Sequence, residues 1–132
     1  MRITHEADYA VRIVYVLASE GKMLPAREIS EKSGVTLRFA LKILRKLASD
    51  GIVASYKGSA GGYELGIDPS RLSLGQIIEC IDGPLEINHC LSEDFDCTRV
   101  GDKNICRFRR IFSDISKELR DKLYAIKLDE FI

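Results

Sequence analysis

The fold is decided by residues 52–67, which read IVASYKGSAGGYELGI. The apolar run 52–56 is typical of a strand, and residues 63–67 return with alternating polarity. Between them, residues 57–62 hold three glycines, and glycine adopts turn conformations that are closed to other residues. The segment therefore predicts a β-hairpin with a glycine-rich tip.

Toward the N-terminus, three helices are predicted before this hairpin. Residues 7–18 carry apolar side chains at helical spacing, which indicates the first helix. Pro25 opens a second helix over residues 25–33, where its missing N–H costs least, and Gly34 closes that helix. Residues 22–24, between these two helices, are predicted to form a short strand.

The third helix follows Thr36, a good N-cap residue, and ends before Gly51. Side chains three and four positions apart share one face of a helix. The face expected to meet the core consists of Leu37, Ala40, Leu41, Leu44, Leu47 and Ala48. The opposite face is basic and consists of Arg38, Lys42, Arg45 and Lys46.

Three helices followed by a hairpin is the order of elements in a winged helix. The second and third helices form a helix-turn-helix, with Gly34 in the turn between them. In such motifs the last helix enters the major groove of DNA and brings its N-terminal residues to the base edges. The sequence therefore predicts a mainly α fold with a small β-hairpin that binds double-stranded DNA.

The candidate DNA-binding residues lie on the third helix and on the hairpin. Those expected to reach base edges are Thr36, Arg38, Phe39 and Lys42. Those expected to bind phosphates, which add affinity without sequence information, are Arg45, Lys46 and Lys57. Gly58, Gly61 and Gly62 let the hairpin tip approach the duplex closely, and Ser59 beside them is a further DNA-binding candidate.

The chain beyond the hairpin is predicted to contain two more helices. Ser73 and Gln76 form a capping-box pattern that starts a short helix over residues 74–81. Residues 82–104 show no clear period, and a loop of this length is typically functional or disordered. Residues 105–127 predict a long helix with one apolar stripe, made of Ile105, Phe108, Ile111, Phe112, Ile115, Leu119, Leu123 and Ile126.

We expect this stripe to pack against a second copy of the chain, because the small domain already has a core of its own; the alternative is packing on its own domain. The organisation that follows has three parts. Residues 1–81 form the winged helix-turn-helix domain, residues 82–104 a cysteine-bearing loop, and residues 105–132 a long C-terminal dimerisation helix with its tail.

The composition is that of a globular protein. The 132 residues are 45% hydrophobic and 30% charged, with a formal net charge of +0. No apolar run approaches the ~20 residues of a membrane span, and the N-terminus lacks a secretory apolar segment. We therefore expect a cytoplasmic protein without a membrane partner, complete from Met1. The charge is polarised, because residues 38–57 hold five cations and one acid, as DNA binding requires.

Three of the four cysteines lie close together, with the spacing Cys90-x6-Cys97-x8-Cys106. In a cytosolic chain such a group indicates metal binding or redox chemistry before disulfides. Thiolates suit iron–sulfur clusters and zinc, but structural zinc usually takes ligand pairs about two to four residues apart. The wider spacing here favours an iron–sulfur cluster. The fourth cysteine, Cys80, is expected in the core.

Four groups of short motifs follow one another along the chain. They are MRIT (1–4) with DYAVR (8–12), IS (29–30) with GV (34–35), LRKL (44–47) with GIV (51–53), and SYKGSAGGYEL (55–65). Together they resemble the IscR/NsrR/CymR (Rrf-two) family of winged-helix transcription regulators, and the last motif matches the family's wing most closely. The resemblance covers nearly the whole chain. Leu41 and Lys57 depart from residues frequent in the family, a polar DNA reader and an arginine respectively.

The resemblance implies a homodimer that is joined by its C-terminal helices and binds a roughly palindromic operator. It also implies a [2Fe–2S] or [4Fe–4S] cluster held by Cys90, Cys97 and Cys106. The fourth ligand is left open. A nitric-oxide-sensing variant of the family uses an acid from the partner's first helix, and Asp8 stands at that position. Asp8 is thus a candidate ligand, although the helix dipole alone also favours an acid there; His5 and His89 are further candidates.

The leading hypothesis is a homodimeric DNA-binding regulator gated by a cluster that senses redox state, nitric oxide, oxygen or iron supply. The alternative is a regulator of the same fold without a cluster, which senses through zinc, thiol oxidation or a protein partner. An enzyme with an active-site cysteine is disfavoured. The sequence offers no general-base histidine in a suitable constellation, no phosphate-binding glycine loop after a strand and no paired catalytic carboxylates.

Overall fold

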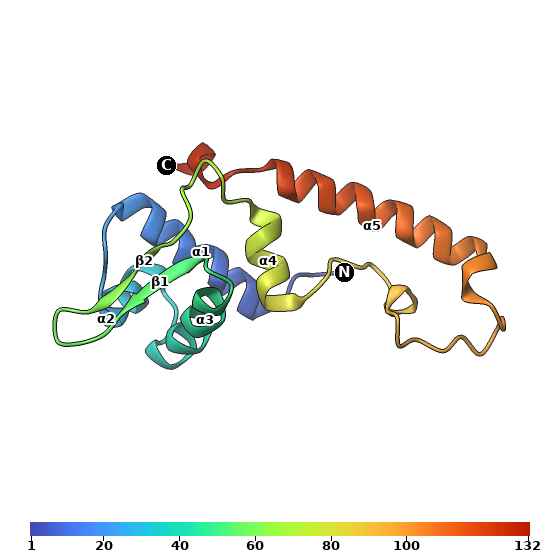
Figure 1. The fold of residues 1–132 in the computed structure, drawn as a ribbon, viewed down its shortest axis with the longest axis horizontal. Helices are drawn as coiled ribbons and strands as arrows, with labels where there is room; N and C mark the ends of the chain where they lie inside the picture. The colour runs from blue at the N-terminus through green and yellow to red at the C-terminus, as the bar shows by residue number, and fades with distance from the viewer.

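The computed structural model describes all 132 residues. Its helices and strands are α1 (His5–Glu20), α2 (Ala26–Ser33), α3 (Leu37–Ser49), β1 (Val53–Tyr56), β2 (Gly62–Leu65), α4 (Leu74–Asp82) and α5 (Arg107–Ala125). Three short 3-10 turns lie at His89–Leu91, Lys103–Ile105 and Leu128–Phe131. Helices α1 to α4 and the hairpin gather into one unit, from which the loop and α5 project as an elongated arm (Figure 1). The predicted class, mainly helical with one hairpin, is confirmed.

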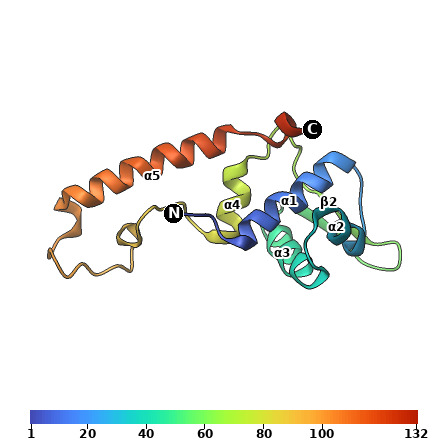
Figure 2. The ribbon, with the colours of Figure 1, turned by 180° about the vertical axis from the view of Figure 1, so that it is seen from behind.

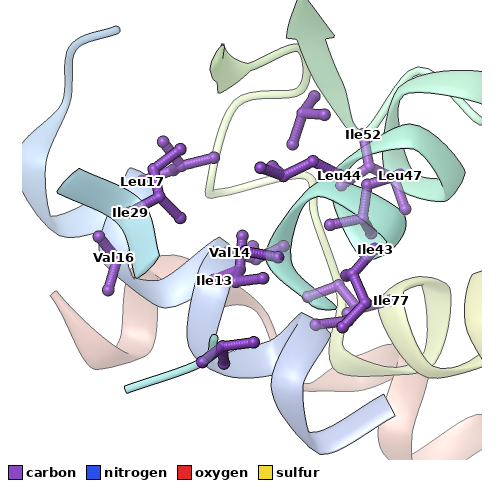
Figure 3. Close-up of a cluster of buried hydrophobic side chains, with 14 of the residues drawn as sticks. Ile13, Val14, Val16, Leu17, Ile29, Ile43, Leu44, Leu47, Ile52 and Ile77 are labelled. Carbon is purple, nitrogen blue, oxygen red and sulfur yellow. The ribbon is translucent and has the colours of Figure 1, made fainter. Parts of the chain in front are cut away.

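The core lies where α1, α3 and α4 meet. Ile13 of α1, Ile43 of α3 and Ile77 of α4 are fully buried there, as Figure 3 shows. The prediction that Leu37 faces the core was wrong, because its side chain is 38% exposed. The buried face of α3 consists of Ala40, Ile43, Leu44 and Leu47, and Ile43 is the residue that the prediction omitted. Leu37 lies outside this face, and Leu41, also predicted to face the core, is only half-buried.

The ends of the helices follow the predicted capping residues. The Thr36 hydroxyl accepts a hydrogen bond from the Phe39 N–H at 3.4 Å, and Ser73 and Gln76 form a complete capping box. Pro25 is the N-cap of α2, so this helix begins one residue later than predicted. Thr4 caps α1, and its own N–H donates to Asp82 at 3.2 Å, which anchors the start of α1 on the end of α4.

The hairpin is antiparallel, with Val53 opposite Leu65 and Tyr56 opposite Gly62. The short strand predicted at residues 22–24 is reduced to one bridge, in which Leu24 and Tyr63 exchange both backbone hydrogen bonds. A Cβ on Gly62 would lie 2.3 Å from the Leu24 carbonyl oxygen. Only glycine therefore allows the base of the wing to approach this part of the chain.

The arm differs from the prediction at both ends of its helix. Cys106 has an extended backbone and is the N-cap of α5, so Ile105 lies outside the helix. Ile126 lies beyond the other end, where the chain turns back to the domain. The Leu128 N–H donates to the Leu72 carbonyl at 2.9 Å, and the Leu128 side chain is buried in the core. The C-terminal tail therefore packs on the winged-helix unit, as the view from behind also shows (Figure 2).

Candidate functional site

The helix-turn-helix is closed by local hydrogen bonds around its turn. Gly34 has a positive φ of 72°, and its N–H donates to the Ser30 carbonyl at the end of α2. The Ser30 hydroxyl donates to the Val35 carbonyl at 2.6 Å. Val35 and Ile29 are buried beneath this turn. These contacts fix α3 against α2 and leave the N-terminal turn of α3 at the surface.

The structure brings the predicted base-reading residues together on the exposed side of α3. Thr36, Arg38, Phe39 and Lys42 are all exposed. An open groove on this side is lined by Arg38, Phe39, Leu41, Lys42 and Arg45. The groove combines cations with apolar side chains, which suits contacts to phosphates and to base edges.

Two of the predicted DNA-binding lysines are engaged by an acid that the sequence analysis missed. The Glu6 carboxylate accepts from Lys42 Nζ at 2.8 Å and from Lys46 Nζ at 3.2 Å. These hydrogen bonds hold the pKa of Glu6 below its ordinary value. Lys46 is half-buried, so it is less available at the surface than Arg45.

The wing presents its tip to solvent. Lys57, Gly58 and Ser59 are exposed, and Gly61 is half-buried. Gly58 has a φ of 102°, and a Cβ on Gly61 would lie 2.2 Å from the Tyr56 carbonyl oxygen. Both glycines are therefore required by the turn itself, in addition to any role in approaching DNA.

The three clustered cysteines line one cavity of about 270 Å³ at the far end of the arm. Its other lining residues are aromatic, cationic or amide side chains, namely Phe95, Phe108, Phe112, Arg99, Lys103, Arg109 and Asn88. No three His, Cys, Asp or Glu side chains lie close enough together to hold a metal ion. The cysteines thus share a cavity, but their thiols are not arranged as ligands of one ion.

Hydrogen bonds hold two of these thiols in place. Arg99 Nη2 donates to Cys106 Sγ at 2.8 Å, and Asn88 Nδ2 donates to Cys90 Sγ at 3.0 Å. The backbone N–H groups of Arg109 and Phe108 at the start of α5, together with the Arg99 guanidinium, hold the pKa of Cys106 below its ordinary value. Cys106 therefore has a greater tendency to form the thiolate, which is the form that binds metals.

The loop around the cavity is organised by one ammonium group. Lys103 Nζ donates to three backbone carbonyls, those of Ser92 at 3.1 Å, Glu93 at 3.0 Å and Phe95 at 3.2 Å. A backbone carbonyl that accepts a hydrogen bond from an ammonium group does not need a partner in a helix or a sheet. The three hydrogen bonds from Lys103 explain how a segment without helical or strand periodicity keeps a defined backbone path. Sequence periodicity could not have indicated these hydrogen bonds.

Of the candidates for a fourth ligand, His5 and Asp8 lie away from the cysteine cavity, whereas His89 lies beside it. Asp8 forms an ion pair with Arg12 at 2.9 Å and lines a different cavity, between the start of α1 and α5. His5 stacks on Tyr9, and His89 lies edge-on to Phe95 with ring centroids 5.1 Å apart. None of the three candidates lines the cysteine cavity.

Cys80 is separate from the cysteine cavity. It packs against the core, and its Sγ lies 3.5 Å from the Lys46 carbonyl. Burial, with a contribution from Asp50, raises the pKa of its thiol to about 12. Cys80 is therefore half-buried at the edge of the core, near the core position expected from the sequence.

A helix-turn-helix with a cationic, exposed last helix, followed by a glycine-tipped wing, defines a winged-helix DNA-binding protein. The profile of the Rrf2 (Rrf-two) family, described as an iron-dependent transcriptional regulator, matches residues 3–132. The chain belongs to the Rrf2 family of transcription regulators, which bind DNA and are not enzymes. None of its helices combines the length and apolarity that crossing a membrane requires.

Comparison with individual proteins is consistent with this family assignment. The chain is 32% identical to the HTH-type transcriptional regulator IscR of Cronobacter sakazakii, over 100% of this chain and 80% of that protein. Among solved structures, it resembles CymR, the global cysteine regulator of B. subtilis, with a TM-score of 0.75 and 20% identity over 98% and 94% of the two chains. It also resembles T. potens IscR, with a TM-score of 0.72 and 21% identity over 98% and 84%. These structural likenesses establish the fold.

Proposed function

We propose that this regulator acts as a homodimer whose DNA binding is gated by an iron–sulfur cluster held by Cys90, Cys97 and Cys106. The observation that carries the proposal is that these three cysteines, from an irregular loop and a helix start, line a single cavity. The proposed signal is redox state, nitric oxide, oxygen or iron supply. As a regulator of genes, the protein is expected to act in the cytoplasm.

The cavity fits such a cluster in its chemistry. Thiolates are the usual ligands of iron–sulfur clusters. Arg99 and Arg109 at the cavity would offset the negative charge of thiolates, and the three phenylalanine rings make part of its lining apolar. A bound cluster would supply a redox-active and gas-sensitive centre, and the loop would have to close further to bring all three thiols to it. The proposed cluster is either [2Fe–2S] or [4Fe–4S].

The homodimer is supported by the exposed apolar side of α5. Phe108, Ile111, Ile115 and Leu119 are between 42% and 61% exposed, and they share one face of the arm. A row of large apolar side chains on a projecting helix is typical of a protein–protein interface. A symmetric dimer would present two recognition helices to a roughly palindromic operator.

Asp8 is our proposed fourth ligand, supplied by the partner subunit. It lines a groove of about 620 Å³ whose other wall includes Leu119 and Leu123 of the apolar face of α5. A second copy of α5 that packs along this groove would bring the partner's arm toward Asp8. Cluster binding would then compete with the Asp8–Arg12 ion pair. Gating follows because loss of the cluster would release α1, which packs against α3. His5 and His89 are the alternative ligands.

On DNA, we propose that Thr36, Arg38, Phe39 and Lys42 read base edges, and that Arg45, Lys46 and Lys57 bind phosphates. The wing tip, with Gly58, Ser59 and Gly61, would lie close to the duplex. Arg38→Ala should therefore relax sequence preference in a binding-site selection. Lys57→Ala should instead weaken binding to all sequences about equally and lower its salt dependence.

The cluster is tested by an anaerobic ultraviolet–visible spectrum with iron and sulfide analysis. Wild type is compared with Cys97→Ala and with the matched control Cys80→Ala, which alters a thiol outside the cavity. A broad visible band with matching iron and sulfide, lost in Cys97→Ala and kept in Cys80→Ala, is the expected result. A featureless spectrum after anaerobic reconstitution would refute the cluster and leave the DNA-binding assignment intact.

A second candidate is direct thiol sensing by the same fold without a cluster. The observation that favours it is the lowered pKa of Cys106 beside Arg99, because a thiolate is the form that peroxides and disulfides attack. Peroxide treatment of the metal-free protein, followed by mass spectrometry, separates the candidates. Selective oxidation of Cys106 that changes DNA affinity supports this candidate, whereas oxidation without an effect on DNA binding rejects it.

A further inference from the structure

The contact between Glu6 and the recognition helix has a consequence for DNA binding. Each carboxylate oxygen of Glu6 faces a different lysine of α3, Oε1 meeting Lys42 Nζ at 2.8 Å and Oε2 meeting Lys46 Nζ at 3.2 Å. The two lysines are one helical turn apart, so their ammonium groups converge on the same carboxylate. The Glu6 side chain is 30% exposed, and those of Lys42 and Lys46 are 53% and 42% exposed.

The position of Glu6 is fixed by the surrounding fold. Thr4 caps the helix through the Ala7 N–H, and Thr4 is itself bound by Asp82 at the end of α4. Ala7 is completely buried next to Glu6. The carboxylate therefore stands on an anchored helix start, and it does not reach α3 from a mobile end.

The helix dipole alone does not account for this arrangement. The dipole favours any acid in the first turn, and Asp8 already supplies one that pairs with Arg12 of the same helix. Glu6 instead points across to another helix and binds cations there. A carboxylate that takes two lysine ammonium groups resembles, in charge and in acceptor geometry, a phosphate of the DNA backbone.

We propose that Glu6 is an internal competitor of DNA, whose carboxylate occupies Lys42 and Lys46 in the free protein and so limits the affinity of the recognition helix for any DNA. The inference rests on the proposed assignment of both lysines to the DNA-binding surface. Much of the affinity for DNA comes from counterions that are released when lysines neutralise phosphates. A lysine that is already neutralised by Glu6 contributes less to this electrostatic part of the affinity.

The test uses Glu6→Gln, which keeps the shape of the side chain and removes its charge. The probe is a fluorescent duplex of arbitrary sequence, about 30 base pairs long, with binding followed by anisotropy between about 50 and 200 mM KCl. Glu6→Gln is expected to raise affinity at low salt by about fivefold or more and to steepen the salt dependence by about one to two released ions. Asp121→Asn is the matched control, because it also removes a carboxylate from a lysine, on α5.

Two further variants separate competition from a general change of charge. In a Lys42→Gln, Lys46→Gln background, the effect of Glu6→Gln should disappear. If the effect persists there, or if Glu6→Gln binds no better than wild type while circular dichroism shows it folded, the inference is overturned. The double lysine variant also tests the assignment beneath it: unchanged DNA binding by that variant would refute the DNA-binding role of the two lysines.

Discussion

Arg120 of α5 donates its Nε–H to both carboxylate oxygens of Glu79 on α4, at 3.0 Å and 3.1 Å. The same carboxylate accepts from the Tyr124 hydroxyl and, at 2.8 Å, from the Leu85 N–H at the start of the cysteine loop. A single side chain therefore joins the DNA-binding unit, the arm helix and the loop. Any change in the cysteine cavity that moves α5 has a direct connection to α4 through Glu79.

Replacing Glu79 by Gln should loosen this junction. The Glu79 side chain is only 13% exposed, so its lost charge-assisted hydrogen bonds are not replaced fully by water. We expect Glu79→Gln to lower the free energy of unfolding by about 1–3 kcal/mol. Thermal and urea unfolding measure this loss. Glu118→Gln, at an exposed position of α5, is the control and should leave stability within about 0.5 kcal/mol of wild type.

The same junction should weaken in acid. Burial alone would raise the pKa of Glu79, but hydrogen bonds from Arg120, Tyr124 and the Leu85 N–H outweigh burial and hold the pKa below its ordinary value. A lowered folded-state pKa means that Glu79 stabilises the fold above its unfolded pKa of about 4.3. This contribution is lost as pH falls through the folded-state pKa. The stability difference between wild type and Glu79→Gln should thus be constant at neutral pH and shrink below about pH 4; a difference that grows in acid would contradict this assignment.

The proposed dimer interface makes a prediction about one residue of the arm. Ile115 is 45% exposed on the apolar face of α5. Ile115→Glu would bury a charge at the interface, and we expect it to weaken dimerisation by about a hundredfold or more. Analytical ultracentrifugation over a range of concentrations measures the change. Ser113→Glu adds the same charge at another exposed position and should leave the dimer intact; equal effects of both variants would argue against this face.

Much of the fold follows from local sequence signals. Thr36, Ser73 with Gln76, and Gly34 act at helix ends through contacts within a few residues, so each was predictable from the sequence alone. The glycine-rich wing was predictable for the same reason. The apolar stripe of α5 was recognised from its period, and Phe108, Ile111, Ile115 and Leu119 of this stripe are exposed.

Contacts between distant segments were not predictable. Glu6 and Lys42 are 36 positions apart, and periodicity indicates which side of a helix is polar but not which acid will face it. The wrong assignment of Leu37 arose similarly, because the sequence pattern does not show which apolar side chains of α3 meet the other helices. Leu128 belongs to a segment too short to show a period, so its return to the core gave no signal.

The base of the wing should not accept any side chain at residue 62. Gly62→Ala would place a Cβ 2.3 Å from the Leu24 carbonyl oxygen and 3.0 Å from the Pro25 nitrogen, both in the backbone. We expect it to lower the free energy of unfolding by about 1–3 kcal/mol and to weaken DNA binding, because the wing must shift. Gly101→Ala, in open space, is the matched control. A Gly62→Ala protein as stable as wild type would show that the Leu24–Tyr63 bridge adjusts without loss.

The last prediction concerns the order of the cysteine loop before any cluster is bound. Lys103 Nζ binds the carbonyls of Ser92, Glu93 and Phe95, and Cys97 lies two residues after Phe95. Lys103→Gln removes the cation and shortens the side chain, so these carbonyls lose their common donor. In the metal-free protein we expect amide exchange over residues 92–97 and alkylation of Cys97 to accelerate by about threefold or more, because local opening requires less free energy.

The matched control for this prediction is Lys122→Gln, at an exposed position near the other end of the arm helix. It makes the same chemical change outside the loop and should leave both rates unchanged. Because the readout is taken without iron, it tests the loop independently of cluster assembly. If Lys103→Gln exchanges and alkylates like wild type, the loop is ordered by its aromatic contacts. If it accelerates as expected, Lys103 also positions the cysteines, and reconstitution should then be slower in this variant than in Lys122→Gln.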